Sequence, residues 1–245
     1  MRLRSFVRRN MLELLRDPIN LAFGLGFPLV LLLLLTAIQA NIPVSLFELA
    51  SLTPGIALFG LSFITLFSAQ LIAKDRSTSF MMRLFASPLR AGEFIAGYTL
   101  PLLPTAVAQG IVCFAAALCL GLDWTVNILL VLAVLLPAAV FFIALGLLCG
   151  SVFTDKQVGG LCGALLTNLA AWLSGTWFDL GLIGGAFEKI AYALPFAHAV
   201  EAGRAALSGD YAAIFPSLWW VIGYAAAMSL AAVLVFRRRT RSGRI

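Results

Sequence analysis

The chain has 245 residues, of which 62% are hydrophobic and 11% are charged. Soluble globular domains carry about 45–50% apolar and about 25% charged residues, so this composition excludes that class and indicates an integral membrane protein. The net charge of +6 does not point to nucleic acid, because the basic residues lie at the ends of apolar segments, as in proteins that contact membrane surfaces. We therefore expect the lipid bilayer as a partner and no nucleic acid.

Six apolar segments are long enough to cross about 30 Å of hydrocarbon as a helix, which takes about 20 residues. They are residues 20–39, 54–73, 94–120, 126–150, 157–177 and 217–236. The third contains Pro101 and Pro104, so we expect a kink or a break there. The sequence predicts one all-α transmembrane domain over residues 1–245, with six transmembrane helices.

The basic residues indicate how these spans are oriented. Every Lys and Arg except Lys189 and Arg204 lies before the first span, between the second and third, between the fourth and fifth, or after the sixth. An even number of spans places all four of these segments on one side. We therefore expect both termini in the cytoplasm, including a basic tail over residues 237–245.

The six spans contain no Asp, Glu, Lys, Arg or His. Pumps and ion-coupled carriers usually keep ionisable groups at membrane depth, so a carrier driven by an ion gradient is disfavoured, although sodium sites built from carbonyl and hydroxyl groups stay open. A membrane assembly subunit that transports nothing is a further alternative. Since no lysine follows a phosphate-binding G-x-x-x-x-G loop, ATP-driven transport by this chain would take its energy from another polypeptide.

No catalytic motif accompanies this pattern. None of the three lysines follows a G-x-x-x-x-G loop, and no H-E-x-x-H or G-x-S-x-G is present, so we expect no enzyme and no catalytic residues. The single histidine, His198, lies on the predicted outer side, where a structural role is more common than a catalytic one. The four cysteines lie in apolar runs without metal-ligand spacing, so we predict small core residues, no metal site and no cofactor in this chain.

Residues 1–17 have the pattern of an amphipathic helix. Leu3, Phe6, Val7, Met11, Leu14 and Leu15 recur at spacings of three and four. Such a helix lies along the membrane surface with its basic side chains among lipid phosphates. The candidate membrane-surface residues are Arg4, Arg8, Arg9 and Arg16. The alternative is a simple positive anchor, which needs no amphipathic pattern.

Residues 74–93 also form a helix-patterned insert between two spans. Ser77 to Ser79 offer an N-cap, and Ser87-Pro88 ends the helix. A helix of about two turns is marginal alone in water, so packing has to stabilise it. Its apolar face and flanking arginines suit a groove on a partner protein, and the alternative is an interfacial loop that turns the chain. The candidate docking residues are Arg76, Phe80, Met81, Arg83, Leu84, Phe85 and Pro88.

Residues 178–216 contain two apolar stretches that are each too short for a span. We expect re-entrant or surface-lying helices on the outer face before the last span. Glu201 and Arg204 are three residues apart on one predicted helix and could pair. An outer gate and a structural lid are equally compatible with this pattern.

A pathway for an amphiphile is expected to be apolar with scattered hydroxyl and amide groups. The candidates are Phe59, Phe63, Phe67, Gln70, Thr167, Asn168 and Trp172, together with Ser62, Thr65 and Ser174. The alternative, which we slightly favour, is that the polar members bond helices to one another.

Three stretches carry a resemblance to a known family. "LTPGIALFGLSFITLFSAQLIAKDR" (residues 52–76), "FMMRLFASPLRAGEFIAGYTL" (80–100) and "YALPFAHAVEAGRAALSGDY" (192–211) are similar to parts of the permease subunit of type-2 ABC exporters. The order of elements resembles that family along essentially the whole chain: an N-terminal elbow helix, six spans and a coupling helix after the second. One departure is Ser77-Thr78, which stands where the family often has a glycine before the coupling helix.

The resemblance implies a function and partners. Two copies, or one copy and a paralogue, would form a homodimer or heterodimer in the bacterial plasma (inner) membrane. Two ABC ATPase subunits would bind below, each holding ATP and Mg and receiving residues 76–90 in a groove. The expected substrate is an amphiphile, such as a drug, lipid or glycolipid, that is exported from the cytoplasm or the inner leaflet.

Overall fold

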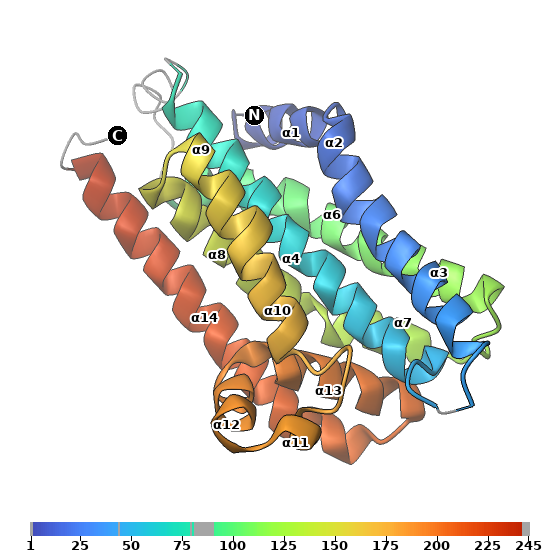
Figure 1. Ribbon diagram of the computed structural model, residues 1–245. Coiled ribbons are helices and arrows are strands. Elements are labelled where there is room, and N and C mark those ends of the chain that lie inside the picture. Colours follow the sequence, from blue (N-terminus) through green and yellow to red (C-terminus); the bar gives the residue numbers. More distant parts are fainter. Residues whose placement is uncertain (1, 44, 79, 81–90, 242–245) are drawn as a thin grey trace.

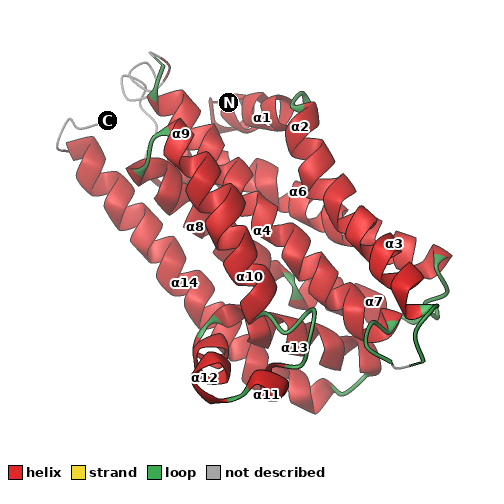
Figure 2. Ribbon diagram, viewed as in Figure 1, coloured by secondary structure: helices red, strands yellow, loops and turns green. Residues whose placement is uncertain are grey.

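The computed structural model describes residues 2–43, 45–78, 80 and 91–241, and all regular structure in this part of the chain is helical. The helices gather into one bundle of tilted rods (Figures 1 and 2). The first half contains α1 (Arg2–Leu15), α2 (Pro18–Leu21), the π-helix η1 (Ala22–Gly26), α3 (Phe27–Gln39), α4 (Leu49–Arg76) and α6 (Ala91–Cys119). The second half contains α7 (Asn127–Val134), α8 (Leu136–Val152), α9 (Asp155–Val158), the π-helix η2 (Gly159–Leu166), α10 (Thr167–Leu173), α11 (Leu180–Ile183), α12 (Gly185–Ala193), α13 (Pro195–Ser208) and α14 (Tyr211–Arg241).

In the described residues, five stretches are helical, long and apolar enough to cross a membrane: Pro18–Gln39, Leu49–Arg76, Gly92–Cys119, Asn127–Val152 and Tyr211–Arg238. The prediction of an all-α membrane protein is therefore confirmed. The remaining predicted span, residues 157–177, corresponds to α9, η2 and α10, which follow one another directly (Figure 1). This segment is not among the five, so the count of six spans stays a prediction.

The core of the bundle is α4. The apolar window of this helix is 89% buried, against 17% for the first and the last candidate span. α4 packs against α3, α6, α8, α13 and η2, so it is surrounded by the other helices. A helix that is apolar on all sides is expected at such a central position.

Two glycines let α8 approach α4 closely. A Cβ atom on Gly146 would collide with the carbonyl oxygen of Thr65, and one on Gly150 would collide with that of Ala69. The spacing of these glycines is G-x-x-x-G, which permits close contact between helices in a membrane. Two hydroxyl groups of α4 cross the same interface: Thr65 Oγ1 donates to the Phe142 carbonyl at 3.0 Å, and Ser68 Oγ donates to the Ile143 carbonyl at 2.9 Å.

The prolines of α6 do not break it, contrary to one expected outcome. α6 is helical from Ala91 to Cys119 through Pro101 and Pro104. The break lies in the fourth predicted span, where α7 ends before Leu135 and α8 begins with Pro137 in its first turn. Proline is tolerated in the first turn of a helix, because the missing N–H is unpaired there in any case.

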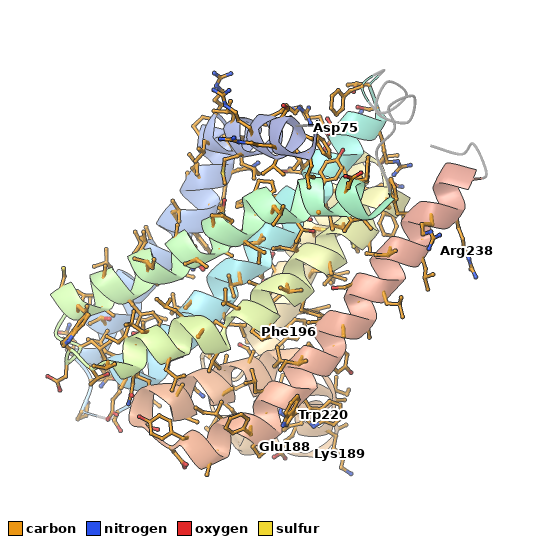
Figure 3. All side chains as sticks on the ribbon, turned by 180° about the vertical axis from the view of Figure 1, so that it is seen from behind. Asp75, Glu188, Lys189, Phe196, Trp220 and Arg238 are labelled. Atoms are coloured by element: carbon orange, nitrogen blue, oxygen red, sulfur yellow. The ribbon has the colours of Figure 1, made fainter. Side chains whose placement is uncertain are left out.

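Different helices form the two ends of the bundle. One end holds α1, the C-terminus of α4, the start of α6, α9 and the C-terminus of α14, and we call it the basic end. Asp75 and Arg238 lie there (Figure 3). The opposite end is covered by α11, α12 and α13, and we call it the cap end; Glu188, Lys189 and Trp220 lie there (Figures 1 and 3).

Candidate functional site at the basic end

A buried carboxylate joins three helices at the basic end. Asp75 lies in the last turn of α4 and is 2% exposed. Arg9 of α1 binds it through two parallel bonds, Nη1 to Oδ2 at 2.6 Å and Nη2 to Oδ1 at 2.7 Å. The hydroxyl group of Tyr98, on α6, donates to Oδ2 at 2.7 Å. This fork geometry and the short distances are typical of a strong, charge-assisted pair.

Two further charges extend this pair towards the surface. Glu13 Oε2 lies 2.8 Å from Arg9 Nη2, and Glu13 Oε1 lies 3.2 Å from Lys74 Nζ. We call Arg9, Glu13, Lys74, Asp75 and Tyr98 the Asp75 cluster. Burial alone would lower the pKa of Arg9, but the hydrogen bond to Asp75 and the charges of Asp75 and Glu13 outweigh it, so the pKa is raised. Arg9 therefore stays charged.

The same α1 surface docks on a backbone carbonyl of α6. Pro101 has no N–H, so the carbonyl of Gly97, four residues earlier, lacks its helical donor. Asn10 Nδ2, which is fully buried, donates to that carbonyl at 2.9 Å. A side chain on Gly97 would collide with the ring of Phe6, one turn before Asn10. Gly97 and Pro101 together thus form the place where α1 binds, and the freed carbonyl is satisfied without breaking α6.

Aromatic contacts connect α1 to the start of the predicted coupling segment. The Phe6 ring packs edge-on against Tyr98 at 5.0 Å between centroids and lies 6.2 Å from the Phe80 ring. The guanidinium carbon of Arg9 lies 4.3 Å from the centre of the Phe80 ring, a cation–π contact. Phe80 therefore contacts Arg9, which also binds Asp75, and Phe6, which also packs against Tyr98.

Arg76 connects α4 to α8. Its Nη1 donates to the Gly150 carbonyl at 2.8 Å and to the Phe153 carbonyl at 3.3 Å. These carbonyls belong to the C-terminal end of α8, where an arginine satisfies oxygens that the helix leaves unpaired. Of the predicted docking residues, Arg76 and Phe80 thus lie beside the Asp75 cluster. Met81, Arg83, Leu84, Phe85 and Pro88 lie outside the described residues.

The predicted membrane-surface residues differ from one another. Arg4, Arg8 and Arg16 are exposed, whereas Arg9 contacts protein groups. The apolar face of α1 is likewise divided: Phe6 and Leu14 are buried in the protein. The sequence pattern did not distinguish a face that meets lipid from one that meets protein.

The predicted pathway residues do not share one surface. Phe59, Phe63 and Phe67 are buried, and Phe27 of α3 covers two of them, at 6.0 Å from Phe59 and 5.8 Å from Phe63. Two of the predicted residues, Phe67 and Gln70, line one small cavity at the basic end, whose polar lining includes Glu13, Asp17, Asn20, Lys74 and Asp155.

The polar candidates on α10 and its neighbours bond mostly within their own helix. Thr167 Oγ1 donates to the Cys162 carbonyl at 2.9 Å, Asn168 Nδ2 to the Ala164 carbonyl at 2.8 Å and Ser62 Oγ to the Phe59 carbonyl at 2.6 Å. Ser174 Oγ donates to the Ala171 carbonyl at 3.0 Å. Thr167 is buried, whereas Asn168 and Trp172 are exposed on α10.

Glu201 and Arg204 at the cap end do not pair, in contrast to the expectation from their spacing. Glu201 accepts hydrogen bonds from the hydroxyl groups of Tyr192 at 2.6 Å and Ser217 at 3.2 Å. Arg204 Nε donates to the Ser51 carbonyl at 2.9 Å, and Nη2 donates to the Gly175 carbonyl at 3.0 Å. The hydrogen bond to Glu201 raises the pKa of Tyr192 to about 12, and burial lowers the pKa of Arg204. Arg204 thus joins α13 to the start of α4 and to the loop that follows α10.

Comparison with known proteins identifies the family of the chain. A search among curated proteins gives no match. A model of the family described as "ABC-2 type transporter" matches residues 1–208. The matched part includes α1, the Asp75 cluster, and every helix of the bundle up to the end of α13. On this match, which covers most of its length, the chain belongs to the ABC-2 type transporter family as a permease.

Proposed function

We propose that this chain is the transmembrane subunit of an ATP-driven exporter, and that a separate ABC ATPase supplies the energy. ATP and Mg would be bound by the ATPase. The observation that carries the proposal is the Asp75 cluster, because it fastens three helices together directly before the predicted coupling segment. A push on residues 76–90 would then move α1, α4 and α6 as one body.

The orientation follows from the basic residues. We place the basic end in the cytoplasm, where Arg237 and Arg238 of α14 and the exposed Arg4 and Arg8 of α1 would meet anionic lipid and the ATPase. The cap end would then face outwards. With α9, η2 and α10 counted as a sixth span, both termini lie in the cytoplasm, as in a bacterial inner-membrane protein.

We place the contact with a second copy, and the substrate pathway, along α10. Asn168 and Trp172 are exposed there. Nδ2 of Asn168 donates to the Ala164 carbonyl, but the rest of the amide group costs free energy against lipid tails unless it is bonded or hydrated. A second permease, identical or a paralogue, or an amphiphilic substrate between the two copies, would remove this cost. Drugs, lipids and glycolipids all combine an apolar part that suits Trp172 with polar groups that suit Asn168.

Docking of the ATPase is tested by Phe85→Asp. We expect this variant to lose co-purification with the ATPase, because a carboxylate in an apolar groove is desolvated without a partner. The control is Leu182→Asp, since Leu182 is 79% exposed at the cap end. Equal recovery of ATPase with both variants contradicts the assignment of the coupling helix. Transport by the purified chain under a proton gradient, without ATPase, would favour an ion-driven carrier instead.

A pathway role for α10 is tested by Asn168→Leu. The amide donates only within its own helix among the described contacts, so we expect normal expression and thermal stability. Transport by the reconstituted complex should fall about tenfold, the effect of losing about 1.4 kcal/mol of interaction with the substrate or the second copy. The control is Leu169→Val, which changes an exposed apolar neighbour. Unchanged transport in Asn168→Leu argues against a pathway on this face.

A further inference from the structure

The single histidine of the chain lies where three helices of the cap end meet. His198 is on α13, and its Nε2 lies 2.9 Å from the carbonyl oxygen of Tyr192 on α12. Its Nδ1 lies 3.9 Å from Glu201 Oε2. Nδ1 is buried and has no hydrogen-bond partner among the described residues. The imidazole ring is stacked on Trp220 of α14, with 5.4 Å between centroids and 2° between planes.

The two nitrogen atoms therefore face two acceptors. A carbonyl oxygen cannot donate, so Nε2 has to carry a proton to bond Tyr192. In the neutral ring, Nδ1 then presents a lone pair towards the carboxylate of Glu201, which is unfavourable. In the imidazolium both nitrogens are donors, and the positive ring is also favoured over the face of an indole. Both ring nitrogens of His198 thus face an oxygen acceptor, and one face of the ring lies on an indole.

The other titratable and charged groups of this region have other partners. The hydroxyl group of Tyr192 donates to Glu201 Oε1 at 2.6 Å, which leaves Oε2 towards His198. Arg204 donates to backbone carbonyls, and the hydroxyl group of Tyr224 donates to the Ala193 carbonyl. Asp179 and Glu188 act on Tyr192 through their charge. Among the described residues, Glu201 is the charged group that faces Nδ1 most directly.

We propose that His198 is a proton-binding site that fastens the cap end in acid. Protonation adds an ion pair from Nδ1 to Glu201, and because Glu201 also accepts from Tyr192 of α12 and Ser217 of α14, the added charge strengthens the junction of the three helices. Histidine is the side chain that changes charge most readily near neutral pH, so the added ion pair is present in acid and is lost as the pH rises. Given the proposed export function, acid outside the cell then holds the outer side closed and slows release of substrate.

The test uses the fact that the sequence contains one histidine. Full-length protein with ¹⁵N-labelled histidine in lipid nanodiscs should give one set of imidazole signals. At pH 8 we expect the tautomer with the proton on Nε2, and on acidification we expect both nitrogens to become protonated. In Glu201→Gln the titration should move to lower pH, because the anion is lost while an acceptor for Tyr192 remains. The control, Glu188→Gln, should leave the titration close to that of the wild type.

The outcomes test the proton site, the gating role and the export function separately. A proton on Nδ1 at pH 8, or a titration that Glu201→Gln leaves unchanged, overturns the proton site. In the reconstituted ATPase complex, ATP-driven transport should fall several-fold when the outer pH changes from 8 to 5.5, and His198→Gln should abolish this fall. A wild-type rate that does not respond to outer pH overturns the gating role. Absence of ATP-driven transport at every pH, with the expected NMR titration, instead overturns the proposed export function and leaves the proton site standing.

Discussion

Arg9→Gln is expected to destabilise the protein by about 2 kcal/mol, because it leaves the buried carboxylate of Asp75 without its cation. Removing one partner of a fully buried ion pair costs about 3–5 kcal/mol. The side chain of Arg9 is 36% exposed, so water can reach its place and reduce that cost. In the complex with the ATPase, the same variant should hydrolyse ATP but move less substrate per ATP, since α1 and α4 would no longer move together.

The measurement is thermal and denaturant unfolding in detergent, with Arg8→Gln as the control. Arg8 is an exposed neighbour that carries the same charge, so its loss should change stability by less than about 0.5 kcal/mol. Asp75→Asn in the Arg9→Gln background should recover part of the loss, because the buried anion is removed as well. Equal stability of the two arginine variants contradicts the structural role of the pair. If Arg9→Gln has normal stability but moves less substrate per ATP, Arg9 acts only in the joint movement of α1 and α4.

The positions of five long helices were predictable from the apolar runs, but the ends of these helices were not. Apolar runs identify the stretches that cross the membrane, since lipid leaves no alternative partner for the backbone. A helix does not stop where its apolar run stops. α4 extends to Arg76 and α14 to Arg241, because polar residues of good helix propensity continue the hydrogen-bonding pattern.

The site was predictable only in part, because its contacts are far apart in the sequence. The periodicity of residues 1–17 predicted a helix, and α1 is present. The same periodicity could not show that Phe6 and Asn10 meet Gly97, or that Arg9 meets Asp75. One available signal was the carboxylate itself: Asp75 lies close to the end of a long apolar run, between Lys74 and Arg76, where an acid needs a partner.

The cap end gives the opposite lesson. The spacing of Glu201 and Arg204 allowed an ion pair, but each side chain bonds to another element instead: Glu201 to Tyr192 of α12, and Arg204 to the Ser51 carbonyl of α4. Spacing on one helix says which groups can meet, and packing of the neighbouring helices decides which do. The histidine of the same helix was assigned to structure by frequency alone, because its acceptor on α12 and its stacked indole on α14 become visible only when these helices are in place.

Gly150→Ala is expected to lower the stability of the fold by about 3 kcal/mol, through the addition of one carbon atom. The new Cβ would lie 2.9 Å from the Cα of Ala69 and would collide with the Ala69 carbonyl oxygen, and backbone atoms inside a helix cannot move aside singly. α8 would have to separate from α4. The same shift would stretch the bond from Arg76 Nη1 to the Gly150 carbonyl at the basic end.

Gly160→Ala is the matched control, because it makes the same change in a helical segment where a Cβ would meet no atom within 4 Å. Alanine favours a helix over glycine by about 0.5–1 kcal/mol, so the control should be neutral or slightly stabilising. Both variants are compared by thermal unfolding in the same detergent. If the glycines matter only through the flexibility of the backbone, the two substitutions change stability in the same direction. If α4 and α8 are held at contact distance, as the hydroxyl bonds of Thr65 and Ser68 require, only Gly150→Ala destabilises the fold.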